Sequence, residues 1–172
     1  MIIKDLDQET LKAAIALKVA CFQEELAGKL ELKLDEDMEY LFYLDWMQKA
    51  KAHQDKRTLL GAFIDDVLVG TIFVSYAEVE DDVNACEING LFVSPDYRNQ
   101  KIATRLMVDA LVNYQDKEHV IVYNHKYAPS NQFFKALGGK VMREDLQENG
   151  KMHVEIFRFS LKDLLNKIIL KR

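Results

Sequence analysis

The stretch that says most about the fold of this chain is residues 87–106, EINGLFVSPDYRNQKIATRL. Its apolar first part predicts a strand that ends at Val93, Pro95 predicts a tight turn, and the residues after Lys101 have the spacing of a helix. A loop that leads directly into a helix lies beside backbone N–H groups without intrahelical partners, where the helix dipole adds positive potential. Arg98 and Lys101 add formal positive charge. The stretch therefore predicts an anion site suited to a phosphate or pyrophosphate.

Helical and strand periodicities extend this pattern over the rest of the chain. On the N-terminal side we expect, in order, a strand at 1–5, helices at 8–27 and about 37–53, and strands at 58–64, 67–77 and 84–93. On the C-terminal side we expect a helix at 101–115, a strand at 119–124, a helix at 129–137, strands at 140–146 and 151–160, and a helix at 161–170.

This order of elements predicts one α/β domain over residues 1–172, with a mixed, mostly antiparallel twisted sheet flanked by helices. The strand–helix–strand unit at 84–124 should bring its two strands into neighbouring, parallel positions. We expect the core of the domain to cover about 1–160, and residues 161–172 to form an additional C-terminal helix.

The bulk composition argues against several classes of protein. The chain is 49% hydrophobic and 30% charged with a net charge of −5, which is an ordinary globular balance without the basic patch of a nucleic-acid binder. No apolar run approaches the roughly 18 residues of a membrane span, and the N-terminus lacks the features of a signal peptide. Cys21 and Cys86 form neither a disulfide framework nor a zinc pattern. We therefore expect a cytoplasmic protein without metal, membrane or nucleic-acid partners.

Two segments resemble motifs of the GNAT superfamily of N-acetyltransferases. Residues 98–103, RNQKIA, follow the motif A pattern Gln/Arg-x-x-Gly-x-Gly/Ala, except that Lys101 stands where the first glycine is usual. Residues 133–139, FFKALGG, are similar to motif B, commonly Phe-Tyr-x-x-x-Gly-Phe. The order of predicted elements also fits this superfamily from residue 1 to about 160.

The resemblance implies that acetyl-CoA is the cosubstrate. Its pyrophosphate would lie on the backbone amides of residues 99–104, and its pantetheine arm along the strand at 91–93, with Gly90 placed for a β-bulge that frees the backbone. The cofactor-binding residues expected on this basis are Leu91, Phe92, Val93, Arg98, Asn99, Gln100, Lys101, Ile102, Ala103, Thr104, Asn131 and Phe134.

An acceptor amine must lose a proton before it attacks a thioester, because lysine-like amines titrate near ~10.4. The resemblance implies Glu87 as the general base, at the strand position where the histone-acetyltransferase branch carries its base glutamate; the alternative is an ion-paired or surface glutamate. Asn89 would share the face of Glu87 in a regular strand. The motif B tyrosine that serves many members as the acid is Phe134 here, and Tyr97, Tyr123 and Tyr127 are its conceivable substitutes.

We therefore expect an N-acetyltransferase that acts on a small-molecule or peptide primary amine. The alternative is a CoA-binding sensor or interaction module with weak or no turnover, which Lys101 and Phe134 favour.

An acidic cluster between residues 24 and 39 favours a cationic acceptor, although a solvated helix face explains it more simply. Dimers are common in the superfamily, and the C-terminal helix could serve a homodimer. Of the four histidines, His125 is the hardest to set aside, because it follows the strand next to the expected acetyl site.

Overall fold

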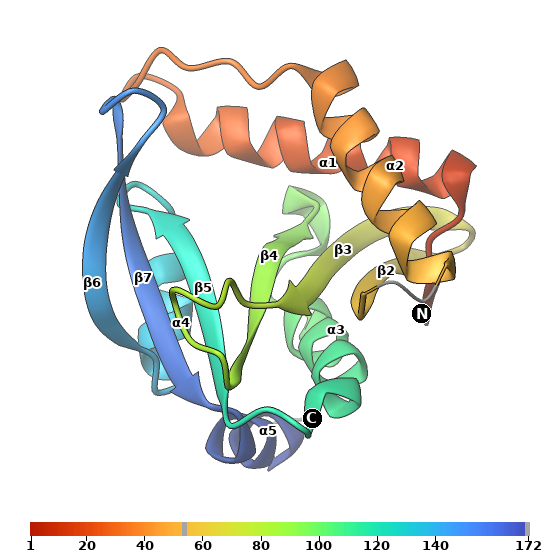
Figure 1. The fold of residues 1–172 in the computed structure, drawn as a ribbon. Coiled ribbons are helices and arrows are strands. Elements are labelled where there is room, and N and C mark those ends of the chain that lie inside the picture. Colours follow the sequence, from red (N-terminus) through yellow and green to blue (C-terminus); the bar gives the residue numbers. More distant parts are fainter. Residues whose placement is uncertain (53–54, 171–172) are drawn as a thin grey trace.

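The computed structural model describes residues 1–52 and 55–170 of the chain (Figure 1). The elements of its N-terminal half are β1 (Ile2–Asp5), α1 (Gln8–Leu26), α2 (Glu36–Lys51), β2 (Arg57–Ile64), β3 (Val67–Tyr76) and β4 (Ala85–Val93). Those that follow are α3 (Ile102–Leu111), β5 (His119–His125), α4 (Ser130–Ala136), β6 (Lys140–Gln147), β7 (Met152–Ser160) and α5 (Leu161–Leu170). Every expected helix and strand is present, but α3 ends earlier than predicted and gives way to a 3₁₀ turn, Val112–Tyr114. The expected last residue of the second helix, His53, and residues 171–172 lie outside the described residues.

The strands form one seven-stranded sheet in the order β1-β2-β3-β4-β5-β7-β6. The pair β4–β5 is parallel, and the other pairs are antiparallel. The predicted mixed, mostly antiparallel sheet is thus confirmed, as is the parallel pairing within the strand–helix–strand unit.

Helices cover both faces of the sheet (Figure 1). On one face α1 and α2 bury side chains against β2 and β3, in a cluster that includes Ile15, Trp46 and Phe73. On the other face α3, α4 and α5 share a larger cluster, in which Leu106 and Ile168 are fully buried. Each such aliphatic side chain stabilises the fold by about 1.5–3 kcal/mol. Helix α5 is therefore part of the main hydrophobic core, because its apolar face packs against α3.

The sheet opens in its middle, between the two parallel strands. Strands β4 and β5 pair only as far as Ile88 and Val122, and beyond these residues they diverge toward α1 (Figure 1). A bulge marks the start of the divergence, because Phe73 pairs with Gly90 and Val74 with Ile88, which leaves Asn89 as an extra residue. The backbone at Gly90 is crowded, since an added Cβ would lie 2.9 Å from the Phe92 ring and 3.0 Å from the Phe73 ring. The diverging ends leave backbone edges of β4 and β5 without a strand partner inside the sheet.

Candidate active site

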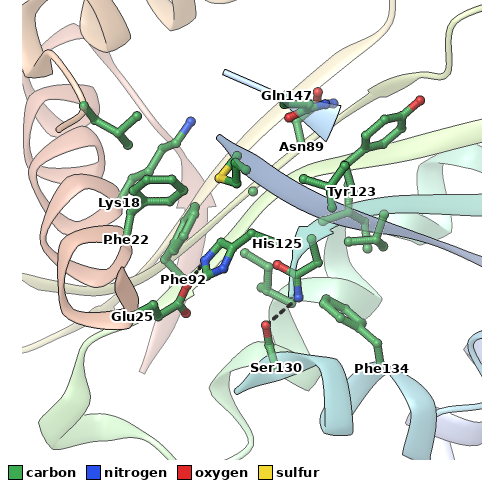
Figure 2. Close-up of a pocket in the computed structure, with 18 of the residues that line it drawn as sticks. Lys18, Phe22, Glu25, Asn89, Phe92, Tyr123, His125, Ser130, Phe134 and Gln147 are labelled. Carbon is green, nitrogen blue, oxygen red and sulfur yellow. Dashed lines mark hydrogen bonds and ion pairs between the residues drawn. The ribbon is translucent and has the colours of Figure 1, made fainter. Parts of the chain in front are cut away.

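Two cavities meet at the gap between β4 and β5. The one we call the groove, about 490 Å³, lies between the end of β4, the start of α3 and α4. The other, which we call the pocket, is about 240 Å³ and lies between α1, β4, β5 and the β6–β7 turn (Figure 2). Both cavities are lined by Glu25, Leu91, Phe92, Ser130 and Phe134. A ligand in the groove can therefore present a group to a second ligand in the pocket.

The loop before α3 has the geometry of an anion site. Asn99 and Lys101 both have left-handed backbone angles, with φ of 61° and 62°, and no side chain caps the helix that starts at Ile102. The amides of its first turn, which include Ala103 and Thr104, have no partner within the helix. Together with the dipole of α3, they present positive potential to the groove. Lys101 adopts the conformation that suits glycine in the motif, and this strain costs roughly 1–2 kcal/mol.

Arg98 holds the loop to α1 through its side chain. The guanidinium donates to the Val93 carbonyl at 3.1 Å and to Glu24 Oε1 at 3.1 Å, and one nitrogen lies 3.7 Å from Cys21 Sγ. Its charge is paired with that of Glu24 at the surface, and Arg98 also lines the groove, so its role as a cofactor contact stays a prediction. Gln100 faces a separate shallow depression that it shares with Arg105.

The open edge of β4 offers backbone hydrogen bonds to the gap. The Ser94 amide donates to Val69 O on β3 at 2.9 Å. Because backbone groups alternate in direction along a strand, those of Leu91 and Val93 point away from β3, and those of Phe92 point toward it. The Val93 carbonyl already accepts from Arg98. The groups available to a ligand are thus both backbone groups of Leu91 and the N–H of Val93.

Glu87 lies on β4 before the bulge, where the strand is paired on both sides. It is opposite Ser75 on β3 and Ile121 on β5. Burial raises the pKa of its carboxyl to about 7, and the negative charges of Asp81 and Glu78 act in the same direction. A carboxyl with this pKa exchanges protons near neutrality. Glu87 does not line the pocket itself, but Asn89 does, and its side chain donates to Ser75 Oγ at 2.9 Å and to the Glu87 carbonyl at 3.3 Å.

The residue at the motif B tyrosine position, Phe134, is buried where the groove and the pocket meet, and it carries no hydroxyl. Of the three tyrosines considered as substitutes, Tyr123 lines the pocket, but its hydroxyl donates to Asp81 and accepts from Arg143 at 2.7 Å. Burial and the bond to Asp81 raise the Tyr123 pKa above its usual range. Tyr97 lines the groove, and Tyr127 lies against Lys29 and Lys126.

Asn131 faces neither cavity. Its amide donates to the carbonyls of His125 and Lys126 at 3.2 and 3.4 Å, and its oxygen accepts from Asn124 at 2.9 Å. These bonds fix the connection between β5 and α4. They position α4 beside the gap, and a contact of Asn131 with the cofactor stays a prediction.

The structure gives a partner to His125, the histidine that the sequence left open, and adds Ser130, which the sequence did not single out. His125 Nε2 lies 2.7 Å from Glu25 Oε2 on α1, and both residues line the pocket (Figure 2). Ser130, one turn before Phe134, accepts from Asn124 at 2.8 Å. The sequence drew attention to His125 because it follows the strand next to the expected acetyl site. No sequence signal pairs residues 25 and 125, because the contact depends on how α1 crosses the sheet.

The acidic cluster of the sequence is only partly present at the site. Of its members, Glu25 and Glu39 line the pocket, and Glu39 is paired with Lys18 at 2.6 Å. Asp35 caps α2 by accepting from the Met38 amide at 3.1 Å. The other members do not line the pocket: Glu24, Glu31, Glu36 and Asp37. A solvated or structural role thus describes most of the cluster, while Glu25 and the turn residue Glu148 make the pocket acidic.

Within residues 1–52 and 55–170, no group of three or more histidine, cysteine, aspartate or glutamate side chains is arranged to hold a metal ion. In the same part of the chain, every helix is too short or too polar to cross a membrane.

The sheet is open between its parallel strands, with an uncapped helix N-terminus at one side of the gap and an acidic pocket at the other. The family model of the acetyltransferase (GNAT) family matches residues 17–138, and the chain belongs to this family. The match confirms the resemblance seen in the two motifs. Acetyl transfer is the activity of this family.

Solved structures share the fold at low sequence identity. The PaiA N-acetyltransferase of Thermoplasma acidophilum, solved in complex with coenzyme A, is 22% identical with a TM-score of 0.72, over 92% of this chain and 98% of that one. An aminoglycoside 6'-N-acetyltransferase complexed with coenzyme A is 16% identical with a TM-score of 0.67, over 94% and 97%. A ribosomal-protein-alanine N-acetyltransferase from Brucella melitensis is 15% identical with a TM-score of 0.68, over 93% and 99%. No curated protein matches the chain significantly.

Proposed function

We propose that this chain is an acetyl-CoA-dependent N-acetyltransferase that transfers the acetyl group directly to a cationic primary amine. The observation that carries the proposal is the meeting, at one gap in the sheet, of an uncapped helix N-terminus with a pocket beside a glutamate whose pKa lies near 7. The three relatives described above bear the names of N-acetyltransferases, two of them in complexes with coenzyme A, and they support the same assignment.

The described residues fit two polar parts of coenzyme A. The amides of Ile102, Ala103 and Thr104 with Lys101 suit the diphosphate, and the free backbone groups of Leu91 suit the amides of the pantetheine arm. When bound, acetyl-CoA supplies an acetyl thioester at the meeting point of groove and pocket. The N–H of Val93 points into the gap and can donate to the oxygen that becomes negative during attack.

Glu87 accepts the proton that the ammonium group of the acceptor must lose before attack. A carboxylate with a pKa near 7 is ionised often enough at neutral pH to accept a proton, and basic enough to hold it. The proton reaches it through the side of the pocket where Asn89 lies, directly or through a water molecule. Glu25 and Glu148 favour a cationic acceptor, because Lys18, the lysine among the pocket-lining residues, is already paired with Glu39.

The experiment is a free-thiol assay of the pure protein with acetyl-CoA and a panel of amines: polyamines, aminoglycosides, amino acids and peptides. We expect thiol release with cationic amines and little with neutral ones. Absence of release across the whole panel contradicts the proposal.

A second candidate function is a CoA-binding sensor or interaction module without turnover. The buried Phe134, which cannot donate a proton, is the observation that favours it. The variant Glu87→Gln distinguishes the two: if the wild type turns over and the variant binds CoA equally well but reacts slowly, the sensor function is excluded. A homodimer and a cytoplasmic location remain predictions, which light scattering of the purified protein and fractionation of cells would test.

A further inference from the structure

The reaction proposed above requires two proton transfers, and Glu87 accounts for one. An ammonium group, R–NH₃⁺, becomes an amide, R–NH–CO–CH₃, so its nitrogen loses two protons. One is released to solvent, and the other balances the thiolate of CoA, which leaves as a thiol. A group beside the gap that moves this second proton from the nitrogen to the sulfur would assist the departure of the thiolate, and Phe134 cannot carry it.

His125 is built to carry a proton at this place. It ends β5, directly beside the gap, and its side chain is only 5% exposed. Its Nε2 lies 2.7 Å from Glu25 Oε2, and Glu25 lines both cavities. In Figure 2 a dashed line joins the imidazole to Glu25, and Phe92 lies beside them. The Phe22 and His125 rings meet edge to face at a centroid distance of 5.4 Å.

The pairing with Glu25 fixes which nitrogen of His125 is free. A carboxylate only accepts hydrogen bonds, so Nε2 carries the proton that faces Glu25, and Nδ1 of the neutral ring keeps its lone pair. Nδ1 is buried and has no hydrogen-bond partner among the described residues. Burying an unpartnered acceptor costs about 1–3 kcal/mol, which a bound donor would recover. Nδ1 exposes less than 1 Å² of its surface, so a small shift of the ring on ligand entry must uncover it before an amine nitrogen in the pocket can donate to it.

We propose that His125 is a second catalytic residue of this site: Nδ1 takes the proton from the nitrogen of the tetrahedral intermediate and gives it to the departing sulfur. In this step the C–N bond is already formed, the C–S bond breaks, and the electron pair of that bond leaves on sulfur, which receives the proton. Glu25 is a positioning residue that orients the ring and stabilises its protonated form. The proposal rests on the proposed function, because it needs an amine and a thioester in the two cavities.

The other groups near the gap are less suited to this step. The Tyr123 hydroxyl already donates to Asp81, and the serine hydroxyl of Ser130 does not exchange protons near neutrality as an imidazole does. The titratable groups that line the pocket around His125 are Glu25 and Lys18 on α1, Glu39 on α2, Tyr123 on β5 and Glu148 in the β6–β7 turn. A pH profile alone would mix their effects, so the test must isolate the imidazole.

The first measurement is independent of turnover. Long-range ¹H–¹⁵N spectra of the histidine rings report which nitrogen carries the proton, and we expect His125 to be protonated at Nε2 with a bare Nδ1. In Glu25→Gln the amide can donate to Nε2, so we expect the ring to shift toward the Nδ1-protonated form. A wild-type ring protonated at Nδ1 overturns the proposal, whatever the activity.

The second measurement is chemical rescue of His125→Ala, with the exposed His153→Ala as the matched control. We expect His125→Ala to lose at least about 10²-fold in kcat with CoA affinity retained by calorimetry, and His153→Ala to lose little. Added imidazole should restore part of the rate. Pyrrole should not, because it has the same shape and one N–H but lacks a basic nitrogen. Equal rescue by both, or full activity of His125→Ala, overturns the role of His125. Failure of the wild type with every amine overturns the proposed function itself.

Discussion

Replacing Glu87 by glutamine should affect activity and stability in opposite directions. The substitution keeps the shape of the side chain and removes its ability to accept a proton and to become charged. Loss of a general base typically reduces turnover by about 10²–10⁴-fold, which corresponds to roughly 3–5 kcal/mol of activation free energy. With its pKa near 7, Glu87 is ionised in about one molecule in ten at pH 6 and in about nine in ten at pH 8. The wild-type kcat should therefore rise about tenfold between these pH values, and the variant should lack this rise.

The stability effect follows from the same raised pKa. Because the folded-state pKa lies above the unfolded value, the neutral carboxyl favours the folded state at low pH, and this stability is lost as the pH rises through about 7. The rise of the pKa from 4.5 to about 7, at about 1.36 kcal/mol per pH unit, bounds the loss at about 3 kcal/mol. Glu87→Gln avoids this loss. At pH 8 it should be more stable than the wild type by up to that amount, or by up to about 6–12 °C in Tm.

The experiment has two parts. Thiol release is followed over time at saturating acceptor, and thermal unfolding is measured at pH 5 and pH 8. The exposed Glu118→Gln is the matched control and should change neither property. A variant that retains wild-type kcat and its pH dependence refutes the role of Glu87 as base. A variant with no added stability at pH 8 refutes the burial of its charge.

Three further substitutions test the groove and the gap. Lys101→Gly should raise stability by about 1 kcal/mol, because it relieves the left-handed strain, yet weaken CoA binding by removing a charge, as unfolding and calorimetry would show. Gly90→Ala should cost about 1–3 kcal/mol and weaken CoA binding, since the new Cβ meets two phenyl rings; unchanged affinity would contradict a need for the bulge. Phe134→Tyr should change kcat little in the wild type but raise it in His125→Ala, where a new hydroxyl can supply the missing proton; no gain there contradicts this reasoning.

The sequence was sufficient to predict the elements and their order. Periodicity located every strand and helix to within a few residues, because apolar side chains repeat at regular intervals and turns such as Asn149-Gly150 separate them. It also predicted the anion loop and the bulge beside Gly90, which depend on residues close together in the chain.

The side-chain partners across the fold could not be predicted in the same way. The sequence marked Arg98 as a phosphate ligand, but it gave no sign of the ion pair that Arg98 forms with Glu24 on α1. It likewise gave no sign of the hydrogen bonds by which Asn131 holds the connection that follows β5. The pair of Glu25 and His125 joins elements a hundred residues apart. Such contacts depend on how helices cross the sheet, which no local pattern records.

A crystal structure of the protein with acetyl-CoA is the most direct test of where the two substrates meet. We expect the diphosphate on the amides of residues 102–104, the pantetheine arm along Leu91 and Val93, and the thioester carbon at the gap, within reach of the pocket that Asn89 and His125 line. Coenzyme A bound away from the gap, or no binding at concentrations that saturate its relatives, would contradict the assignment of this site.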